Sequence, residues 1–370
     1  MRIASFNVEN LFNRVKVMNR DNWEDGKQVL DLYARFNKII CKEKYSAADK
    51  AKIAEILTAL GLAKSDDTKL VVLRQNHEKL VRRPKGGGIE VIAEGRDEWI
   101  GWLELKVEPV DAAAIENTAR IIHEVDADIL AVIEAEDRIA LLRFSDQMLE
   151  RVGATPYPHT MLIDGNDERG IDVGVLTKQD YALNSICSHV DDRDGQGLVF
   201  SRDCPEYEVQ LPSGDMLLVL VNHLKSKGFG SQATSNARRK RQAERIKDIY
   251  DRRRAKGRKL IAVVGDLNDT PDSDPLSPLL GNGSDLKDVS EHPKWQDDGF
   301  PGTWGNGNAS GKIDYILLSP ELYQKVTAAG VNRKGVWGGK NGDRWEILPT
   351  ITRKVEAASD HAAIWADLNA

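Results

Sequence analysis

Short apolar runs alternate with polar loops that carry Gly, Asp and Asn along most of the chain. Apolar runs of this length, bounded by turn residues, predict buried β-strands. Two predicted helices, Asp111–Glu124 and Ser235–Lys256, each lead directly into a strand. Because helices between strands cover the faces of a sheet, this alternation predicts an α/β layered fold. The clearest predicted strands are Ile3–Val8, Ile129–Ile133, Val173–Leu176, Met216–Val221, Leu260–Val264 and Tyr315–Leu318.

The segment from about residue 13 to residue 110 does not follow this alternation. A mixed helical stretch, Ala47–Leu60, precedes two strand-like runs, Leu70–Leu73 and Ile89–Ala93, with the turn-like Lys85–Gly88 between the runs. We interpret the segment as an insertion with its own hairpin in a single domain that spans residues 1–370. A lid and an oligomer contact are the alternatives. Because this segment begins close to the end of the first strand, we expect it to flank that end of the sheet.

Composition leaves the class of partner open. The chain has 370 residues, 41% of them hydrophobic, which is enough for one large domain or two small ones. The formal net charge of −6 does not favour non-specific binding of nucleic acid. A bound cation or a local basic patch can nevertheless outweigh the average charge.

The three cysteines, Cys41, Cys187 and Cys204, are far apart and lack CxxC spacing. They predict neither a disulfide framework nor a thiolate zinc site. The chain starts with the strand-like Arg2–Val8, without the charged leader and apolar stretch of a secretory signal. No run of about 18 apolar residues occurs, so no membrane span is predicted. We therefore expect a cytoplasmic protein.

Polar side chains of the types used in catalysis stand next to the predicted strands. In α/β sheets, ligands bind at the carboxyl ends of strands, where loops present side chains from a rigid base. We therefore expect most of these side chains to gather at one edge of the sheets. The residues that follow strands are Asn7, Asn10, Glu134, Glu136, Asn222, His223, Asp266, Asn268 and Asp269, while Asp314, Asp360 and His361 precede strands.

Each residue also has a simpler interpretation. Glu134 follows a buried strand, where either an ion pair or a hard cation such as Mg²⁺ would compensate its charge. The run Gly265–Pro271 fits an Asx-rich turn, although Asp-x-Asn also suits a proton acceptor beside a hydrogen-bond donor to a phosphoryl oxygen. A lone histidine such as His223 is more often structural than catalytic. Together, two histidines, several acids and two asparagines are the groups needed for metal-assisted phosphoryl transfer.

Six short motifs contain these residues. They are Asn7-Val8-Glu9-Asn10, Ile133-Glu134, Asn222-His223-Leu224-Lys225-Ser226, Gly265-Asp266-Leu267-Asn268-Asp269-Thr270-Pro271, Ile313-Asp314-Tyr315 and Ser359-Asp360-His361. In this order, the chain resembles the endonuclease/exonuclease/phosphatase superfamily, which includes pancreatic-type deoxyribonucleases, apurinic-site endonucleases, neutral sphingomyelinases and inositol-polyphosphate phosphatases. The resemblance runs from residue 2 to about residue 368, except for the insertion. It implies a four-layer α/β sandwich of two packed mixed sheets flanked by helices, with the insertion after the first strand.

The resemblance also implies a metal-dependent phosphoric-ester hydrolase that uses Mg²⁺, with Mn²⁺ as the alternative ion. Glu134 resembles the principal Mg²⁺ ligand of the family, with Asn7 beside it and Asp360 near the ion. Asp266 and Asn268 resemble the pair that handles the attacking water and the scissile phosphate.

His361 resembles the catalytic histidine that Asp314 orients, and His223 resembles the second catalytic histidine. Asp172 is the candidate acidic partner of His223, and a plain strand-edge acid is the alternative. The implied reaction is in-line attack of water on phosphorus, with Mg²⁺ neutralising charge on the phosphoryl oxygens. The number of metal ions and the assignment of acid and base stay open.

The segment Asn236–Arg245, on the second predicted helix, is strongly basic. It fits a solvated helix face as well as a surface that contacts the phosphates of a polynucleotide. The Gly-rich, aromatic loop Gly335–Gly342 either stacks on a base or packs internally. We predict phosphate contacts by Arg169, Lys225, Arg238 and Arg241.

Our first hypothesis is a nuclease whose partner is nucleic acid, DNA or RNA, cut internally or from an end. The second is a phosphatase or phospholipase-type hydrolase acting on a small phosphate ester or a lipid headgroup. The lack of a membrane-inserting stretch weighs against the lipid. The third hypothesis is a non-catalytic binding protein, and the intact set of acids, asparagines and histidines argues against it.

Overall fold

The computed structural model describes residues 1–17, 23–167, 169–227 and 231–370. The chain divides into two compact units, each with its own hydrophobic core. Unit 1 contains Met1–Phe12, Val110–Lys227 and Ser231–Ala370, and unit 2 lies within Asn13–Pro109.

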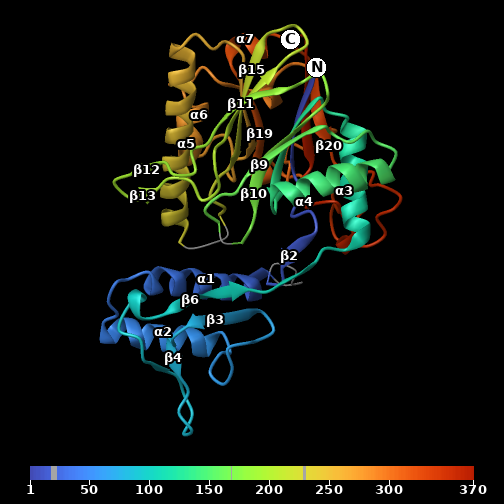
Figure 1. The fold of residues 1–370 in the computed structure, drawn as a ribbon. Coiled ribbons are helices and arrows are strands. Elements are labelled where there is room, and N and C mark those ends of the chain that lie inside the picture. The colour runs from blue at the N-terminus through green and yellow to red at the C-terminus, as the bar shows by residue number, and fades with distance from the viewer. Residues whose placement is uncertain (18–22, 168, 228–230) are drawn as a thin grey trace. The chain divides into compact units, whose positions relative to one another are not determined.

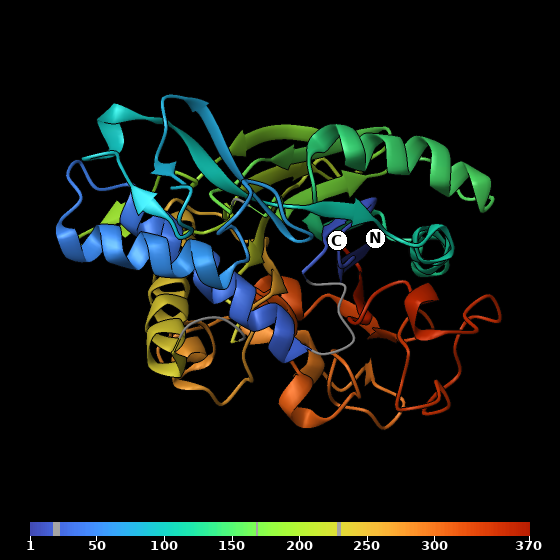
Figure 2. The same ribbon diagram turned by 90° about the horizontal axis from the view of Figure 1, so that it is seen from below.

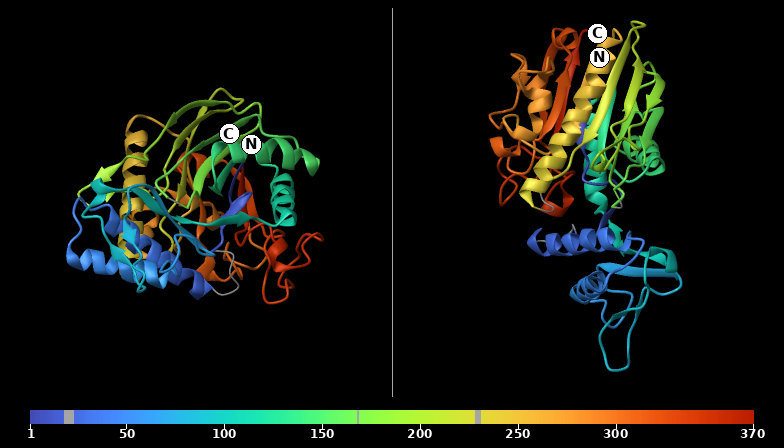
Figure 3. Two further views of the ribbon diagram at one scale, coloured as in Figure 1. Left: turned by 60° about the horizontal axis from the view of Figure 1, so that its bottom comes forward. Right: turned by 90° about the vertical axis from the view of Figure 1, so that its left-hand side faces the viewer.

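Unit 1 is built on two mixed β-sheets, which appear side by side in Figures 1 and 3. In spatial order, the seven-stranded sheet contains β18 (Trp295–Gln296), β20 (Val326–Asn332), β21 (Ala363–Leu368), β1 (Arg2–Asn7), β8 (Ile129–Ala135), β10 (Asp172–Thr177) and β9 (His159–Ile163). The six-stranded sheet contains β11 (Leu183–Cys187), β14 (Glu206–Gln210), β15 (Met216–His223), β16 (Ile261–Asp266), β19 (Asp314–Leu318) and β17 (Lys287–Asp288). All six strands predicted from the apolar runs are confirmed.

The period-2 alternation of the strands divides their side chains between two cores. Ile3 and Ile129 of the seven-stranded sheet pack against Val219 of the six-stranded sheet, in the core between the two sheets. Their neighbours Ala4 and Leu130 face the opposite side, where helices cover them. Strands that are apolar on both faces, as these are, form the inner layers of a sandwich.

Helices cover the two outer faces. α3 (Ala112–Val125) and α4 (Arg138–Arg143) pack on the seven-stranded sheet, and α5 (Gln232–Ala255) and α6 (Ser277–Leu280) pack on the six-stranded sheet. The view from below in Figure 2 shows α3 and α5 on opposite sides of the sheets. Unit 1 is therefore the four-layer α/β sandwich that the motifs implied. Shorter helical segments are Phe144–Leu149, Asp274–Leu276, Val289–Glu291, Ala309–Gly311, α7 (Pro320–Tyr323) and Lys354–Glu356, and β12 (Arg193–Asp194) pairs with β13 (Gly197–Leu198).

The first and last strands lie side by side in the seven-stranded sheet. β21 pairs antiparallel with β1 on one side and with β20 on the other. The N-terminal ammonium of Met1 donates a 2.8 Å hydrogen bond to the carbonyl oxygen of Leu368, so both ends of the chain lie at the same end of the sandwich (Figure 1). Asn7, at the other end of β1, begins the edge that carries the candidate site.

Unit 2 is a small α/β unit. Its core contains Phe36, Ile53 and Trp99, and the indole nitrogen of Trp99 donates a 3.0 Å hydrogen bond to the hydroxyl of Tyr45. Among the described residues of this unit, none of the helices has the length and hydrophobicity needed to cross a bilayer, and the same holds for unit 1. The elements are α1 (Trp23–Ile40), α2 (Ala47–Ala59), β3 (Val71–His77) paired with β6 (Ile100–Leu105), β4 (Val81–Arg82) paired with β5 (Glu90–Val91), β2 (Asn13–Val15) paired with β7 (Val107–Pro109), and a short 3-10 helix at Arg96–Glu98.

The hairpin in unit 2 differs from the prediction. The turn Lys85–Gly88 joins β4 and β5, whereas the run at Leu70–Leu73 belongs to β3, which pairs with β6. Gly101 permits this pairing, because a Cβ atom there would lie 2.0 Å from the carbonyl oxygen of Arg74. A close approach that needs glycine is not visible in an apolar pattern alone.

Candidate active site

The six-stranded sheet places three polar side chains in a row at one edge. His223 ends β15 and is the register partner of Asp266, which ends β16. Asp266 is in turn the partner of Asp314, the first residue of β19. Because β19 runs antiparallel to β16, its beginning lies level with the end of β16. Asp314 therefore joins the site although it precedes its strand in the sequence.

Gly265 allows β15 and β16 to approach closely beside this row. Its φ of +130° is disfavoured for residues with a side chain. A Cβ atom at this position would also lie 1.9 Å from the carbonyl oxygen of Asn222. Any larger residue would push the two strands apart and separate His223 from Asp266.

The seven-stranded sheet contributes Asn7 and Glu134 from neighbouring strands. Asn7 ends β1 and pairs with Ile133 of β8, one residue before Glu134. Glu134 adopts a left-handed backbone conformation with φ of 68°, and so does Asn268 of the other sheet with φ of 56°. Such conformations each cost about 1–3 kcal/mol and tend to occur where a site requires them. Their presence at this edge indicates that the surrounding packing enforces the position of both side chains.

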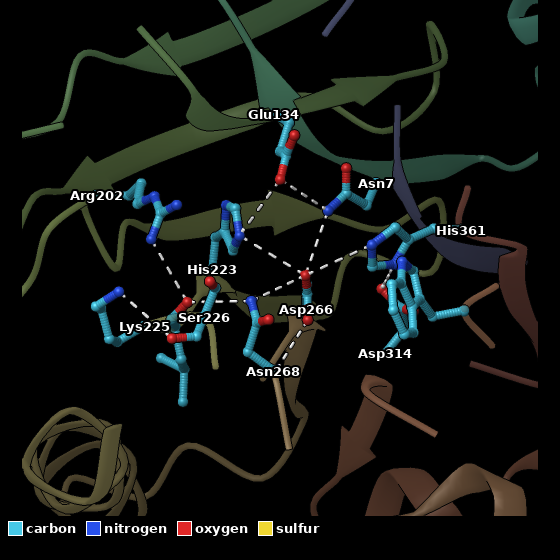
Figure 4. Close-up of polar contacts among 12 residues, drawn as sticks. Asn7, Glu134, Arg202, His223, Lys225, Ser226, Asp266, Asn268, Asp314 and His361 are labelled. Atoms are coloured by element: carbon cyan, nitrogen blue, oxygen red, sulfur yellow. Dashed lines mark hydrogen bonds and ion pairs between the residues drawn. The ribbon is translucent and has the colours of Figure 1, made fainter. Parts of the chain in front are cut away.

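Asp266 is the centre of the polar cluster (Figure 4). Its Oδ2 atom accepts hydrogen bonds from Nδ2 of Asn268 at 3.0 Å and from Nδ2 of Asn7 at 3.3 Å. The Nε2 atoms of His223 and His361 lie 3.6 Å and 3.9 Å from the same oxygen. Side chains from both sheets therefore converge on one carboxylate.

His361 is held by hydrogen bonds at both its ring and its backbone. Its Nδ1 lies 2.9 Å from Oδ2 of Asp314, which also accepts a 2.6 Å hydrogen bond from the hydroxyl of Thr303. The hydroxyl of Ser359 accepts from the His361 amide and donates to the carbonyl oxygen of Asn7. Burial alone would lower the pKa of His361, but the neighbouring carboxylates, chiefly that of Asp314, outweigh it and raise the pKa well above its usual value. Asp314 therefore favours the imidazolium form of His361.

His223 has the opposite environment. Burial lowers its pKa well below the usual value, and the guanidinium groups of Arg202 and Arg169 lower it further. Its Nε2 lies 3.6 Å from Oε1 of Glu134, and its buried Nδ1 has no hydrogen-bond partner within the described parts of the chain. Asp172, the candidate partner of this histidine, instead accepts a 2.8 Å hydrogen bond from the Gly165 amide. The described contacts therefore do not join Asp172 to His223, and its catalytic role stays a prediction.

Asp360 lies at the outer side of His361. Its Oδ1 is 3.7 Å from Nε2 of His361, and its Oδ2 accepts a 2.8 Å hydrogen bond from the indole of Trp304. The Trp304 side chain is 46% exposed. The indole thus fixes one oxygen of Asp360 at the margin of the cluster.

Basic side chains lie on the other side, next to His223. Arg202 and Lys225 are on this side of Asp266 in Figure 4, away from His361. Asp167 receives two hydrogen bonds from the Arg169 guanidinium, at 2.8 and 2.6 Å, and lies 3.3 Å from Nε of Arg202. Arg169, predicted to contact phosphate, is thus in an ion pair, and its role toward substrate stays a prediction.

Most of the basic face of α5 is used in ion pairs within the protein. Arg239 is fully buried and contacts Asp269, and Arg241 contacts Asp194 at 2.8 Å. Further pairs are Lys240–Asp274, Arg245–Asp192, Lys247–Asp251, Arg253–Glu206 and Arg254–Glu321. Arg238 differs, because no described residue forms an ion pair or hydrogen bond with it. The sequence alone could not separate Arg238 from Arg241.

Comparison with known proteins identifies the family. The sequence profile described as "Endonuclease/Exonuclease/phosphatase family" matches residues 106–361. The chain belongs to this family. It is therefore a metal-dependent phosphoesterase.

Several solved structures are similar to parts of this chain. A mannosyl-6-phosphatase from Bacteroides thetaiotaomicron is 17% identical, over 69% of this chain and 91% of that chain, with a TM-score of 0.49. Truncated TDP2 from Caenorhabditis elegans is 19% identical, over 69% and 90%, with a TM-score of 0.47. The human Nocturnin catalytic domain is 15% identical, over 70% and 87%, with a TM-score of 0.48. The search of curated proteins gave no match.

The donor set of this family member fits the divalent ion that the family uses. Asn7 Nδ2 lies 3.3 Å from both Oε1 of Glu134 and Oδ2 of Asp266, so the two carboxylates face the same point. Burial raises the pKa of Asp266, and the nearby charges of Asp314 and Glu134 raise it further. A cation would relieve this repulsion. Carboxylate oxygens are ligands that Mg²⁺ and Mn²⁺ prefer. The Asn7 amide presents its Nδ2 atom to this point and its Oδ1 atom to the Glu9 amide.

Arg202, Asp167, Thr303 and Trp304 are site residues that the sequence analysis missed. Thr303-Trp304 lies about ten residues before Asp314, and a polar–aromatic pair at this distance from an assigned acid is a usable signal. Arg202 and Asp167 lie in irregular segments without a pattern, so their position depends on the folded chain.

Proposed function

We propose that the protein is a Mg²⁺-dependent nuclease that hydrolyses phosphodiester bonds of DNA or RNA by in-line attack of water. The observation that carries this proposal is the convergence of both sheets on Asp266, with Glu134 and His361 on different sides of it. A site of acids, amides and imidazoles around one point suits the charge that develops on phosphoryl oxygens.

In this proposal, Glu134, Asn7 and Asp360 hold the metal ion. The ion, when bound, neutralises charge on the phosphoryl oxygens. Asn268, whose Nδ2 is 3.0 Å from Asp266, donates a hydrogen bond to a phosphoryl oxygen, and Asp266 orients the attacking water and accepts its proton.

The two histidines then act as different groups. His361, held protonated by Asp314, cannot accept a proton at neutral pH, so it donates a hydrogen bond to the phosphoryl group. His223 is neutral and lies 3.6 Å from both Glu134 and Asp266, where it orders these carboxylates. In the overall reaction, the bond from phosphorus to the leaving oxygen breaks as the bond to water oxygen forms, and one proton passes to the leaving oxygen.

The basic side chains next to His223 support a polyanionic substrate. Arg202, Lys225 and Arg238 add positive charge beside the catalytic residues although the chain as a whole carries −6. A polynucleotide presents phosphates on both sides of the scissile one, which such residues would position without reading the sequence. A small ester with more than one phosphate is the second candidate, because the same charges would bind it.

The test is a substrate series with a metal-ligand variant. Purified protein with Mg²⁺ or Mn²⁺ is incubated with plasmid, single-stranded DNA, RNA, inositol phosphates and sphingomyelin. We expect cleavage of nucleic acid, and we expect Glu134→Ala to lower the rate by at least about a thousandfold. Glu116→Ala, which removes an ion-paired glutamate on α3, is the control. Intact nucleic acids alongside turnover of a small ester would reject the nuclease.

A further inference from the structure

The basic side chains next to His223 include two guanidinium groups that are incompletely paired. Arg202 is 2% exposed. Its Nε atom lies 3.3 Å from Asp167 but forms no hydrogen bond with any described residue. One terminal nitrogen of its guanidinium donates a 3.5 Å hydrogen bond to the Leu224 carbonyl oxygen. Nε of Arg238 is also buried, and no hydrogen bond to it is found in the part of the chain that the structure describes. Buried donors without acceptors are costly, so an acceptor from outside the chain would stabilise both groups.

Arg202 shares a carboxylate partner with Arg169. Asp167 lies 3.3 Å from Nε of Arg202 and already receives two hydrogen bonds from the Arg169 guanidinium. Burial alone would raise the pKa of Asp167, but these two guanidinium groups hold it well below the usual value, so Asp167 contributes a single negative charge. Arg238 forms no ion pair or hydrogen bond with any residue that the structure describes, so a bound anion would compensate its charge.

Lys225 lies within reach of the same guanidinium groups. Burial lowers the pKa of Lys225 to about 7, and the positive charges of Arg202, Arg169 and Arg238 lower it further. A bound anion would oppose these positive charges and favour the ammonium form. The basic residues thus lie close enough together to act on one ligand.

This cluster is separate from the point where Glu134 and Asp266 face each other, but it lies beside that point. Arg202 is close enough to the Glu134 and Asp266 carboxylates for their charges to raise its pKa, although burial keeps it below the usual value. Lys225 follows two residues after His223, and Figure 4 shows Lys225 and Arg202 on one side of that histidine. A ligand in the cluster would therefore lie next to the phosphate that is hydrolysed.

We propose that Arg202, Lys225 and Arg238 form a subsite for a second phosphate group of the substrate, adjacent to the scissile phosphate. This inference rests on the proposed nuclease function and specifies its substrate further. Guanidinium groups bind phosphate through paired, charge-assisted hydrogen bonds, and an ammonium adds a point charge. The second phosphate is either the next phosphodiester of a polynucleotide or a terminal phosphate, and these two sources share the chemistry of the subsite.

The first experiment measures phosphate binding without hydrolysis. Methyl phosphate is titrated calorimetrically into the full chain in EDTA, where the carboxylates of Glu134 and Asp266 repel an anion. We expect Arg238→Met, at a half-buried helix position, and Arg202→Lys each to weaken binding at least about fivefold. Lys247→Met, which removes a cation that pairs with Asp251 on the same helix, should bind as the wild type does. Equal binding by Arg238→Met and wild type would overturn the subsite.

The second experiment measures preference for a second phosphate. Five substrates are compared, and cleavage of the same linkage is followed in each. They are a dinucleoside monophosphate, the same compound with a terminal phosphate at its 5′ end or at its 3′ end, and a trinucleotide whose other linkage is a neutral methylphosphonate or a charged phosphodiester. We expect an additional charged phosphate on one side to raise kcat/KM by about tenfold or more, and Arg238→Met to remove this preference. The terminal-phosphate and phosphodiester arms show which source the subsite takes.

The two proposals fail in different ways. Nucleotide turnover with no preference for a second phosphate would overturn the subsite and leave the nuclease intact. Arginine-dependent binding of methyl phosphate without turnover of any nucleotide would overturn the nuclease and leave the subsite intact. If a change at the fully buried Arg202 prevents folding, the Arg238→Met variant alone tests the subsite.

Discussion

The two sides of Asp266 carry the same kind of residue in opposite electrical environments. His361 and His223 are both buried, and their Nε2 atoms lie 3.9 Å and 3.6 Å from one carboxylate oxygen. On the His361 side, Asp314 and its neighbouring acids raise the pKa of the histidine well above its usual value. On the His223 side, burial and then Arg202 and Arg169 lower the pKa well below it.

This difference separates the roles of two histidines that sequence motifs cannot tell apart. Burial alone would make both neutral, so the carboxylate of Asp314 is what keeps His361 charged. A charged histidine and a neutral one on either side of a single carboxylate give the site one cationic donor and one uncharged group. In the proposed mechanism, the acidic side would interact with the developing negative charge, and the basic side would bind the rest of the substrate.

Among the variants that test the difference between the two sides, the largest expected effect comes from removing the charge that holds His361. Asp314→Asn should lower kcat by about 100- to 1,000-fold with little change in KM, because His361 loses its ionic partner but the substrate contacts remain. Steady-state kinetics on an oligonucleotide measure this. Asp288→Asn, at a buried acid of the same sheet that contacts Lys312, controls for loss of a buried carboxylate. Equal kcat values for both variants and wild type would show that the acidic side has no catalytic role.

Removing the carboxylate of Asp167 should mainly reduce stability. Asp167→Asn removes the charge that contacts Arg169 and the buried Arg202, which costs about 3 kcal/mol. Urea unfolding of the variant and of the wild type measures this difference in the free energy of unfolding. Asp251→Asn breaks an exposed pair with Lys247 and should change stability by less than about 1 kcal/mol. Similar losses in both variants would contradict the idea that the basic side is a buried charge cluster.

Asp172, also on the basic side, predicts a pH dependence of stability. Burial raises the pKa of Asp172 to about 7; Asp164 and Asp167 raise it, while the Gly165 amide and Arg202 oppose the shift. Between about pH 4 and pH 7, the folded chain keeps a proton that the unfolded chain has lost, so stability falls as the pH rises. Asp172→Asn lacks this titration. Relative to wild type, the free energy of unfolding of this variant should therefore rise by about 2 kcal/mol between pH 5 and pH 8. Urea unfolding at both pH values measures this change. A difference independent of pH would refute the shift.

The smallest expected effect concerns the two arginines of α5. Arg241 forms an ion pair with Asp194 and donates to the carbonyl oxygens of Gly197 and Leu198, whereas Arg238 forms no ion pair or hydrogen bond with a described residue. Arg241→Met should therefore raise KM for an oligonucleotide by no more than about twofold, and Arg238→Met should raise it more. Kinetics at low and moderate salt would show the difference most clearly, because salt screens phosphate contacts. If Arg241→Met raises KM more than Arg238→Met does, the whole basic face of α5 would contact phosphates.

Much of unit 1 could be predicted because its signals are local. Strands such as Met216–His223 are continuous apolar runs that end in a polar group, and six motifs in order indicated the family and hence the sandwich. Unit 2 was less predictable. The helical spacing of Leu30, Tyr33, Phe36 and Ile40 would support α1, but the pairing of β3 with β6 depends on a close approach at Gly101 that only the folded chain reveals.

The site was predictable as a set of residues and not as an electrostatic arrangement. Asn7, Glu134, His223, Asp266 and His361 could be named from motifs because each adjoins a strand end. The charge states of the histidines depend on Arg202 and on the Asp314 contact, which join segments far apart in the sequence. Their catalytic assignments therefore stay predictions, although the geometry brings the side chains together.

The position of β21 has a consequence for synthesis on the ribosome. β21 separates β20 from β1, and Ser359 and His361 directly precede it. While these residues remain inside the exit tunnel, the nascent chain lacks both a central strand of its seven-stranded sheet and its cationic histidine. Pairing of β1 with β21 spans more than 350 positions and is an intrinsically slow contact. We therefore expect hydrolysis only from chains in which β21 has joined the sheet.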